Sequence, residues 1–389
     1  GMKFKLADLC DYAREKITIE EVDERNYIST ENLLPNKNGV TVASSVPNVK
    51  YAKFFKVGDV LVSNIRPYFR KIWYATFEGG CSNDVLVFRS KSTVRSRFLY
   101  YVLADDKFFD YATATSKGTK MPRGDIKAIM EYSVPDIPHD AQIKIADLLS
   151  VLDDKIERNI AINKNLEEQL TALYEDLISS SRCIMSTVGD IAEKIAMGPF
   201  GSNIKVSTFV NQGIPIISGN HLRGLFLEEH SFNYITEAHA EKLGNSIVYP
   251  NDIIFTHAGN IGTVAMIPPD CNYEYYIISQ RQFYLRCDEN KVVPEYVLLY
   301  FHSRKGQQKL LSYANQTAVP SIAQPATNLK KITIPLPTYT TQKKWQRTTE
   351  PLVSLYLKNR CENMRLCSIR DTLLPRLMSG ELDVSNIEL

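Results

Sequence analysis

Lysine and arginine side chains gather in two short windows of the sequence. Residues 50–71 hold six of them with one acidic residue, Asp59, and residues 117–127 hold four with one acidic residue, Asp125. Tyr68 adds an aromatic ring to the first window. Cations that grip phosphate groups beside aromatic rings are typical of nucleic-acid-binding surfaces, although the solvated surfaces of other proteins carry such windows too. The two windows therefore favour nucleic acid as a ligand without establishing it.

Motifs for catalysis are missing. The sequence has no GxxxxGK[ST], GxGxxG, HExxH or GxSxG, and no Asn-Pro-Pro-aromatic motif of an amino-methyltransferase. The six histidines have no metal-ligand spacing, and His257 beside Asn260 is most simply a loop residue. Asp153 and Asp154 could be mistaken for a nuclease pair, but they fall inside a long predicted helix. We expect no catalytic residue, no metal site and no cofactor in this chain.

Composition sets wider limits. With 389 residues and 44% hydrophobic content the chain is long enough for two cores, and its net charge of +2 does not by itself indicate nucleic acid. The seven cysteines form no CxxC pair, which predicts free thiols in a reducing compartment. No apolar run of 18 residues occurs, so we expect a cytoplasmic protein with no membrane contact.

The sequence repeats itself at a distance of about 200 residues, which is the strongest guide to its architecture. The repeat extends from Val57-Gly58-Asp59-Val60-Leu61 and its counterpart at 249–254 to two long helical segments. The matched helical positions are Leu152, Ile156, Asn159, Asn163, Leu166, Leu173 and Leu177 in the first copy, and Leu352, Tyr356, Asn359, Asn363, Leu366, Leu373 and Leu377 in the second. Two similar domains, each followed by a long helix, are the expected organisation.

The first long helix is predicted over residues 140–178, on the order of 60 Å at 1.5 Å per residue. Its apolar residues recur at steps of three and four, as in a coiled-coil seam. In an antiparallel pair whose residue numbers sum to 522, buried amides face amides and apolar layers face apolar layers. A slipped register would strand a buried amide, at about 1 to 3 kcal/mol each. The predicted interface comprises Leu149, Leu152, Ile156, Asn159, Asn163, Leu166, Leu170, Leu352, Tyr356, Asn359, Asn363, Leu366 and Leu373. The alternative is that both asparagine pairs face solvent on ordinary amphipathic helices.

The predicted fold class is α+β, with two mixed α/β recognition domains joined by two long helices in an antiparallel, pseudo-twofold coiled coil. The expected segments are a first domain over 1–138, a first long helix over 139–181, a second domain over 182–338, and a second long helix with a tail over 339–389. Within the domains we expect short β-prone runs such as Phe54–Val62, which Gly58-Asp59 breaks, and single helices over Val94–Tyr111 and Pro294–Tyr313. Two related domains about a twofold axis suit a ligand with two half-sites, such as duplex DNA.

Three stretches resemble a known family. Gly198-Pro199-Phe200-Gly201-Ser202-Asn203, followed by Gly213-Ile214-Pro215-Ile216-Ile217, is similar to the opening of a target-recognition domain in specificity subunits of type I restriction-modification systems. The closing run Leu374 to Leu382 and the Pro335-Leu336-Pro337 segment with Gln342 also resemble that family. In the first copy, Ile65-Arg66-Pro67-Tyr68 stands in place of the glycine-bearing run Ala258 to Gly262.

The resemblance implies a non-catalytic subunit that recruits two methyltransferase subunits and a restriction/translocase subunit to a bipartite site in double-stranded DNA. S-adenosylmethionine, ATP and magnesium would then belong to those partners. A coiled-coil adaptor with two protein-binding domains is the main alternative, and an enzyme with an unrecognised site is a further one. The adaptor predicts no salt-dependent affinity for duplex DNA.

Candidate DNA contacts were chosen for their side-chain chemistry near strand ends. Arginine and lysine can read guanine or grip phosphate, while asparagine and glutamine suit adenine. In the first domain they are Asn64, Arg66, Tyr68, Arg70, Lys117, Lys120 and Arg123. In the second they are Ser202, Asn203, His257, Asn260, Asn315, Gln316 and Ser321.

Overall fold

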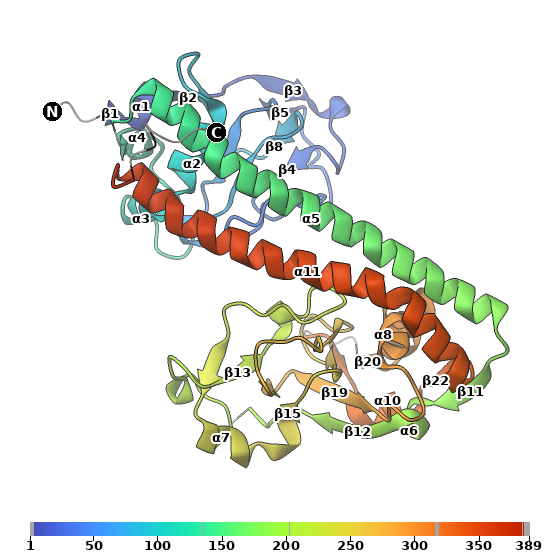
Figure 1. The fold of residues 1–389 in the computed structure, drawn as a ribbon. Coiled ribbons are helices and arrows are strands. Elements are labelled where there is room, and N and C mark those ends of the chain that lie inside the picture. The colour runs from blue at the N-terminus through green and yellow to red at the C-terminus, as the bar shows by residue number, and fades with distance from the viewer. Residues whose placement is uncertain (1–3, 135, 202, 316–318, 383, 385–389) are drawn as a thin grey trace. The chain divides into compact units, whose positions relative to one another are not determined.

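The computed structural model describes residues 4–134, 136–201, 203–315, 319–382 and 384. The chain forms two compact units (Figure 1). The first unit is Gly1–Arg158 with Glu362–Leu389, and the second unit is Asn159–Cys361. Both long helices pass from one unit into the other, so each unit combines a mixed α/β body with part of each helix.

The body of the first unit holds two four-stranded sheets. One is antiparallel throughout and has the order β2 (Cys10–Tyr12), β9 (Val85–Ser90), β6 (Val60–Ser63), β7 (Ile72–Tyr74). The other has the order β3 (Lys16–Thr18), β5 (Tyr51–Phe55), β8 (Gly79–Cys81), β4 (Tyr27–Ile28), in which β4 and β8 are parallel.

The second unit repeats this plan with one difference. Its first sheet has the order β12 (Ala192–Met197), β19 (Gln282–Cys287), β16 (Ile253–Thr256), β17 (Val264–Met266). Its second has the order β14 (Asn233–Ile235), β13 (Ile214–Ile217), β18 (Tyr276–Ile278), β15 (Ile247–Val248). The parallel pair β13–β18 and the antiparallel pair β15–β18 match β4–β8 and β5–β8. The fourth strand is therefore added at opposite edges in the two units.

The central strands β6 and β16 explain why the repeated sequence is so apolar there. Val60 and Val62 pack in the core that the sheet forms with the helices, whereas Leu61 points into the core on the opposite face. In β16, Ile253 and Phe255 likewise pack in the core on one face of the sheet, and Ile254 packs in the core on the other face. Because both faces are buried, these strands read as continuous hydrophobic runs rather than alternating ones.

The break expected at Gly58-Asp59 within the run Phe54–Val62 is confirmed, since β5 ends at Phe55 and β6 begins at Val60. The residues between them make a turn in which Gly58 has φ of +91°, a conformation that favours glycine.

The single helices predicted over Val94–Tyr111 and Pro294–Tyr313 are wrong. Each is two helices, α2 (Ser96–Ala104) with α3 (Asp106–Ala114), and α8 (Pro294–His302) with α9 (Arg304–Leu311). Asp105 and Ser303 interrupt them in extended conformations, and each side chain accepts a hydrogen bond from a backbone N–H of the following helix. An N-cap of this kind satisfies donors that a new helix leaves unpaired. The break is therefore a built feature of both copies.

Shorter elements complete each unit. In the first they are β1 (Phe4–Lys5), α1 (Leu6–Leu9), α4 (Ile126–Met130) and β10 (Ser133–Val134). In the second they are β11 (Ile184–Thr187), α6 (Val188–Ile191), α7 (Glu237–Lys242), β20 (Ala314–Asn315), β21 (Ser321–Ile322), α10 (Pro325–Lys331) and β22 (Thr333–Leu336).

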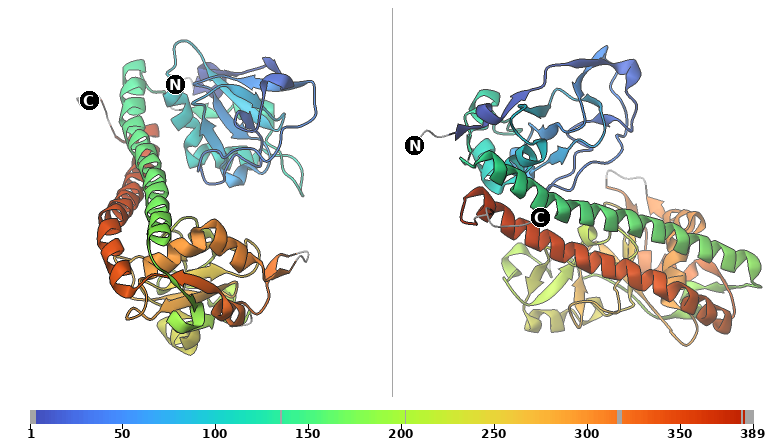
Figure 2. Two further views of the ribbon diagram at one scale, coloured as in Figure 1. Left: turned by 90° about the vertical axis from the view of Figure 1, so that its right-hand side faces the viewer. Right: turned by 45° about the horizontal axis from the view of Figure 1, so that its top comes forward.

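The two long helices are α5 (His139–Ser180) and α11 (Tyr339–Met378), and they pack together along both units (Figure 2). In the first unit Arg370 pairs with Asp153 at 2.9 Å and Lys155 with Glu362 at 3.2 Å. In the second unit the Asn359 amide donates to Asn163 Oδ1 at 2.9 Å. Residue numbers rise on α5 as they fall on α11, so the pairing is antiparallel. The helix ends are anchored alike, because Gln142 and Gln342 each donate to a backbone oxygen five residues earlier.

Candidate nucleic-acid interface

The first site is the loop that follows β6, residues 64–70, together with the loop over 117–124. Arg66 N–H donates to Pro122 O at 2.8 Å, and Gly124 N–H donates to Asn64 O at 3.0 Å. A β-bridge joins Ile65 to Arg123. The two groups of residues chosen from the sequence of the first domain are therefore brought together, although about 50 residues separate them.

The second site is the loop that follows β16, residues 257–262, together with the antiparallel strands β20 and β21. Gly259 N–H donates to Pro320 O at 3.0 Å, and Ile322 N–H donates to His257 O at 2.8 Å. A bridge joins Ala258 to Ser321. His257, Asn260, Asn315 and Ser321 are thus neighbours as well. Ser202 and Gln316 lie outside the described residues.

The two sites correspond bond for bond. The Arg66–Pro122 bond matches Gly259–Pro320, and the Gly124–Asn64 bond matches Ile322–His257. Pairing of Lys117 with Arg123 likewise matches pairing of Asn315 with Ser321. Each unit thus presents the same backbone frame with different side chains on it. The equivalent positions are Asn64 and His257, Arg66 and Gly259, Lys117 and Asn315, and Arg123 and Ser321.

A third segment, the turn before β9 or β19, is hydrogen-bonded to the backbone of each site. The residues of this turn were not among the contacts predicted from the sequence. Asn64 N–H donates to Asp84 O at 2.8 Å, and His257 N–H donates to Arg281 O at 2.9 Å. Asp84 and Arg281 stand in the turns before β9 and β19. Asp84 and Arg281 are 197 residues apart, and the same offset separates the first residues of β9 and β19. The internal repeat could therefore have identified the two turns as equivalent.

Arg66 occupies an unusual backbone conformation in the first site. Its φ is +49°, where the second unit has Gly259 with φ of +86°. A residue with a Cβ pays roughly 1 kcal/mol or more for this left-handed region, and such strain gathers at functional positions. Its Nε is buried without a hydrogen-bond partner among the described residues. The chain therefore has an arginine at a position whose backbone conformation favours glycine.

Three of the predicted cations in the first site are engaged by carboxylates. Arg70 pairs with Asp106 at 2.9 Å, Lys117 with Asp125 at 2.5 Å, and Arg123 with Asp84 at 3.2 Å. Surface pairs of this kind are worth about 0 to 1 kcal/mol. Pairs this weak can be exchanged for contacts with another anion. Tyr68 and Lys120 are exposed.

The buried amide of Asn64 sits beneath the first site. Its Oδ1 has no hydrogen-bond partner among the described residues, and a Cβ on Gly124 would lie 2.7 Å from it. Asn64 is 8% exposed. This packing makes Asn64 a supporting side chain of the loop frame rather than a residue with a broad face to solvent.

In the second site His257 is the half-buried centre of the frame. Its Nε2 lies 3.1 Å from Gln280 O, so this nitrogen carries the proton that the carbonyl accepts. Burial lowers the pKa of His257 below its ordinary value of 6.5, which keeps the ring neutral at pH 7. The remaining predicted contacts Asn203, Asn260 and Asn315 are exposed, and Asn203 O accepts from the His239 ring at 2.8 Å.

The residues predicted for the helix interface differ in burial. Leu149, Ile156, Asn159, Asn163, Leu166, Leu170, Tyr356 and Asn359 are buried, and Leu152, Leu352, Asn363, Leu366 and Leu373 are half-buried. Arg370, which lies opposite Leu152 in a register whose residue numbers sum to 522, sends its guanidinium to Asp153. Asp153 also accepts a hydrogen bond from the buried Tyr101 at 2.7 Å, so its carboxylate serves helix packing.

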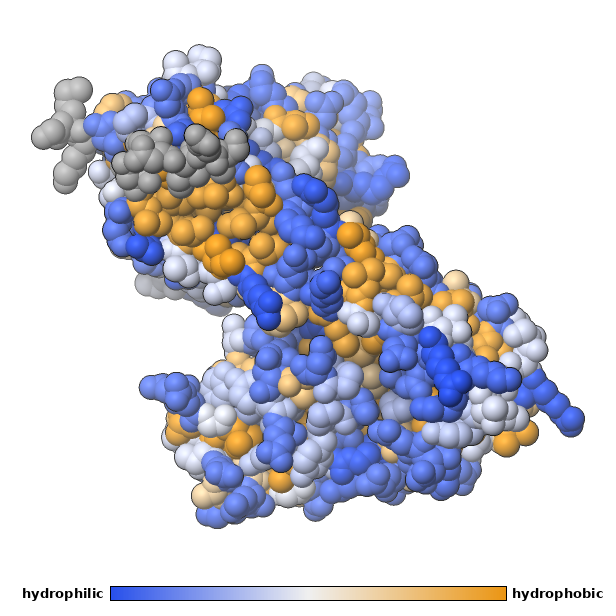
Figure 3. All heavy atoms as spheres, viewed as in Figure 1, coloured by the Kyte–Doolittle hydropathy of each residue, from blue (hydrophilic) through white to orange (hydrophobic). Residues whose placement is uncertain are grey.

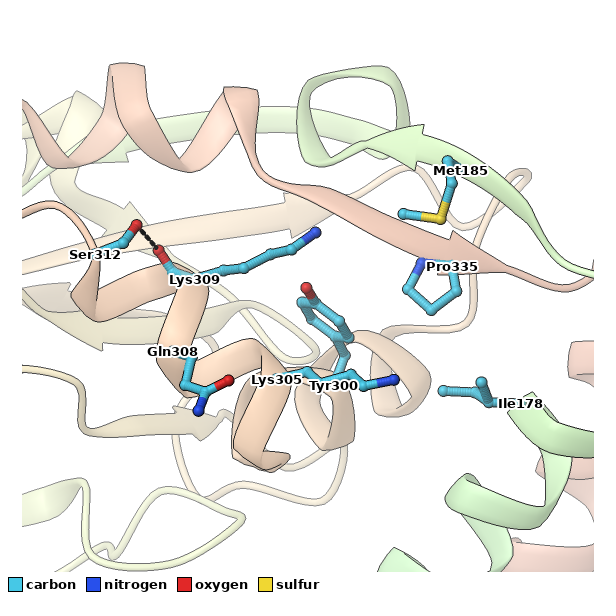
Figure 4. A pocket seen from close by; sticks show the side chains of 8 residues that line it. All are labelled: Ile178, Met185, Tyr300, Lys305, Gln308, Lys309, Ser312 and Pro335. Carbon is cyan, nitrogen blue, oxygen red and sulfur yellow. Dashed lines mark hydrogen bonds between the residues drawn. The ribbon is translucent and has the colours of Figure 1, made fainter.

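A pocket of about 410 Å³ lies elsewhere in the second unit, between α8, α9 and β22 (Figure 4). Its walls include Ile178, Met185 and Tyr300, and Lys309 at its edge already donates to Thr333. None of the predicted DNA contacts lines it.

Over the described ranges, no three His, Cys, Asp or Glu side chains come close enough to hold a metal ion. No helix in the described part of the chain has the length and apolar composition needed to cross a membrane.

A sequence model of the type I restriction modification DNA specificity domain matches the chain twice, over residues 2–171 and 184–359. The chain belongs to this family. The first match covers one α/β body and most of α5, and the second covers the other body and about half of α11. The duplication predicted from the sequence is therefore a duplication of the specificity domain.

Proteins similar to this specificity-domain chain match it over different fractions of its length. The specificity subunit of type I restriction enzyme MjaIX from Methanocaldococcus jannaschii is 23% identical over 316 residues, which are 76% of this chain and 71% of that protein. The EcoDI specificity subunit from Escherichia coli is 32% identical over 165 residues, 37% of each chain. The crystal structure of a type I restriction-modification S subunit from M. genitalium has a TM-score of 0.56 at 17% identity, covering 97% of this chain and 96% of that one. The specificity-domain chain shares the fold of that subunit.

Proposed function

We propose that this chain is the DNA-recognition subunit of a type I restriction-modification complex and that each unit reads one half of a bipartite site in double-stranded DNA. Membership of the specificity-domain family supports this proposal, and so do the relatives named as specificity subunits. A non-catalytic role for the chain is part of the proposal.

The observation that carries the proposal is the matched backbone frame of the two sites. The loops that follow β6 and β16 are held by equivalent hydrogen bonds and bridges to a second segment. The two segments together present Arg66 and Arg123 in one unit and Gly259 and Ser321 in the other. A common frame fixes how each unit meets the duplex, while the side chains that differ can discriminate between bases. Two units with different side chains suit a site whose halves differ in sequence.

Within this proposal the side chains divide by their chemistry. Arg66 and Arg123 are suited to guanine through bidentate bonds, and exposed Lys120 to phosphate. Asn260 and Asn315 present amides suited to adenine. Asn64 and His257 support the two frames, because their backbone carbonyls accept the hydrogen bonds from Gly124 and Ile322.

Partner subunits would bind the exposed faces of the long helices. Apolar side chains are exposed there, with Val151, Met364 and Ile369 in the first unit and Ile160 and Leu355 in the second. Figure 3 shows hydrophobic surface over these helices. We propose that two methyltransferase subunits and restriction subunits dock on the complex, and that S-adenosylmethionine, ATP and magnesium belong to them.

An adaptor that binds proteins through both bodies is the competing function. It would also use exposed apolar helices, but it gives no reason for the matched loop frames or for their amide and arginine side chains. The DNA specificity domain family supports the recognition function over the adaptor.

The test is to co-express the chain with the methyltransferase subunit encoded beside it and to map methylated adenines in the host genome by single-molecule sequencing. A split motif, with one half that changes when one unit is exchanged for that of a relative, is the expected result. A complex that forms but methylates no split motif would contradict the recognition function. Failure to form any complex would favour the adaptor.

A further inference from the structure

The turns that complete the two frames carry opposite charges. Asp84 in the first unit and Arg281 in the second accept the equivalent hydrogen bonds, from Asn64 N–H at 2.8 Å and His257 N–H at 2.9 Å. The two residues therefore occupy the same position relative to the loops that follow β6 and β16. An aspartate on one frame stands where the other has an arginine.

The other positions of the frame carry positive charge in the first site and none in the second. The first site has Arg66 and Arg123, and Asp84 pairs with Arg123 at 3.2 Å. The second site has Gly259 and Ser321 at those positions, so neither arginine has a counterpart there. Each site thus contains guanidinium groups, but they come from the loops in the first site and from the turn in the second.

Arg281 is placed to act outside the protein. Its side chain is exposed, and its Nη1 lies 3.5 Å from where a Cβ on Gly259 would stand. The absence of a side chain on Gly259 leaves this space to the guanidinium. Across the described ranges no carboxylate forms an ion pair with Arg281, in contrast to Arg123.

The backbone beneath Arg281 is held on both sides. Its own carbonyl accepts the His257 N–H, and the carbonyl of Gln280 faces the His257 ring at 3.1 Å. The following residue, Gln282, is 1% exposed within β19. A long side chain on a fixed base loses less conformational freedom when it binds, which favours a specific contact.

We propose that Arg281 determines specificity in the second unit by reading a guanine of its half-site, in place of the arginines that the first unit presents. The planar guanidinium supplies two parallel donors that match guanine O6 and N7, which lysine cannot reproduce. This inference rests on the proposed recognition of DNA and adds a residue that the sequence motifs do not include.

The experiment compares the full chain with its Arg281→Ala and Arg281→Lys variants, each in complex with the methyltransferase subunit. A library of duplex oligonucleotides is methylated and sequenced, so both half-sites are read in one experiment. Arg304→Ala removes one exposed arginine from α9 of the same unit and is the matched control. The half-site of the first unit is an internal control for folding and assembly.

Both Arg281 variants should relax the preference at one guanine of the second half-site by about tenfold to a hundredfold. The first half-site and the Arg304→Ala complex should keep the wild-type pattern. Unchanged preference in Arg281→Ala would overturn the assignment, and so would a uniform loss of methylation that lysine restores, because that result marks a phosphate contact. If the wild-type complex itself has no split preference, the recognition function fails, which is distinguishable from failure at Arg281 alone.

Discussion

Arg286 holds the carboxylate of Asp252 through two parallel hydrogen bonds, from Nε at 2.9 Å and from Nη2 at 2.7 Å. Asp252 is 1% exposed. The first unit has the same pair in Arg89 and Asp59, with bonds of 2.8 and 2.7 Å. In each unit the pair ties the start of the strand before the site loop to the strand that follows the site turn. The backbone frames of both sites are therefore supported by an equivalent Asp–Arg ion pair, which we call the clamp.

Removing the clamp should destabilise the protein. Asp252→Ala leaves the Arg286 guanidinium, whose side chain is 22% exposed, without its partner. Loss of this charged hydrogen-bonded pair should cost about 1.5 to 3 kcal/mol. Urea denaturation of the purified chain is the measurement. Asp270→Ala, at an exposed acidic residue of the same unit, should stay within about 0.5 kcal/mol of the wild type. Equal stability of the two variants would mean that the pair contributes little.

The asparagine pair of the long helices should behave as one unit. Asn359→Leu leaves Asn163 Oδ1 without the donor that now lies 2.9 Å away, at a cost of about 1 to 3 kcal/mol. The double variant Asn163→Leu/Asn359→Leu should recover much of that loss, since leucine then faces leucine. A double-mutant cycle by thermal denaturation measures the coupling. Additive losses would show that the two amides do not depend on each other.

The Arg66→Gly variant distinguishes the effect of Arg66 on protein stability from its effect on DNA base preference. Glycine adopts the left-handed φ of +49° without strain, so the free energy of unfolding should be unchanged or higher by up to about 1 kcal/mol. If Arg66 reads a base, the preference at one position of the first half-site should weaken by about 1 to 3 kcal/mol. Methylation of an oligonucleotide library measures this effect, and Arg66→Ala should weaken it alike. A wild-type pattern in both variants would remove Arg66 from the interface.

Stability of the second unit should fall in mild acid because of His221. This side chain is buried, and its Nδ1 accepts the Ser218 N–H at 2.9 Å. Burial, aided by the charge of nearby His230, lowers the pKa of His221 to about 4. A pKa lowered by folding means that stability is complete above pH 6.5 and is lost as the pH falls from there toward 4, by roughly 2 to 3 kcal/mol.

The matched variant for His221 is His221→Asn, whose amide oxygen can replace Nδ1 as acceptor but cannot titrate. Urea denaturation at pH 7.5 and pH 4.5 should show a smaller acid loss in this variant than in the wild type. The same acid loss in both proteins would assign the effect to other groups.

The sequence alone determined the features that depend on periodicity and on the repeat. Apolar steps of three and four located α5 and α11, and the match of Asn163 with Asn359 predicted a register in which the structure has a hydrogen bond between these two amides. These features are readable because side chains on a helix face recur with a fixed local period. The repeat also located the loops after β6 and β16, because strands buried on both faces are conspicuously apolar.

Tertiary structure decided what depends on contacts between distant parts of the chain. Sequence periodicity did not reveal the breaks at Asp105 and Ser303, because each of them is set by how two short helices pack and cap. Nor did it show that Asp106 would engage Arg70, or that Asp84 and Arg281 would join the two sites. Those relationships arise from contacts between segments that lie tens of residues apart in the chain, and no local pattern in a sequence records them.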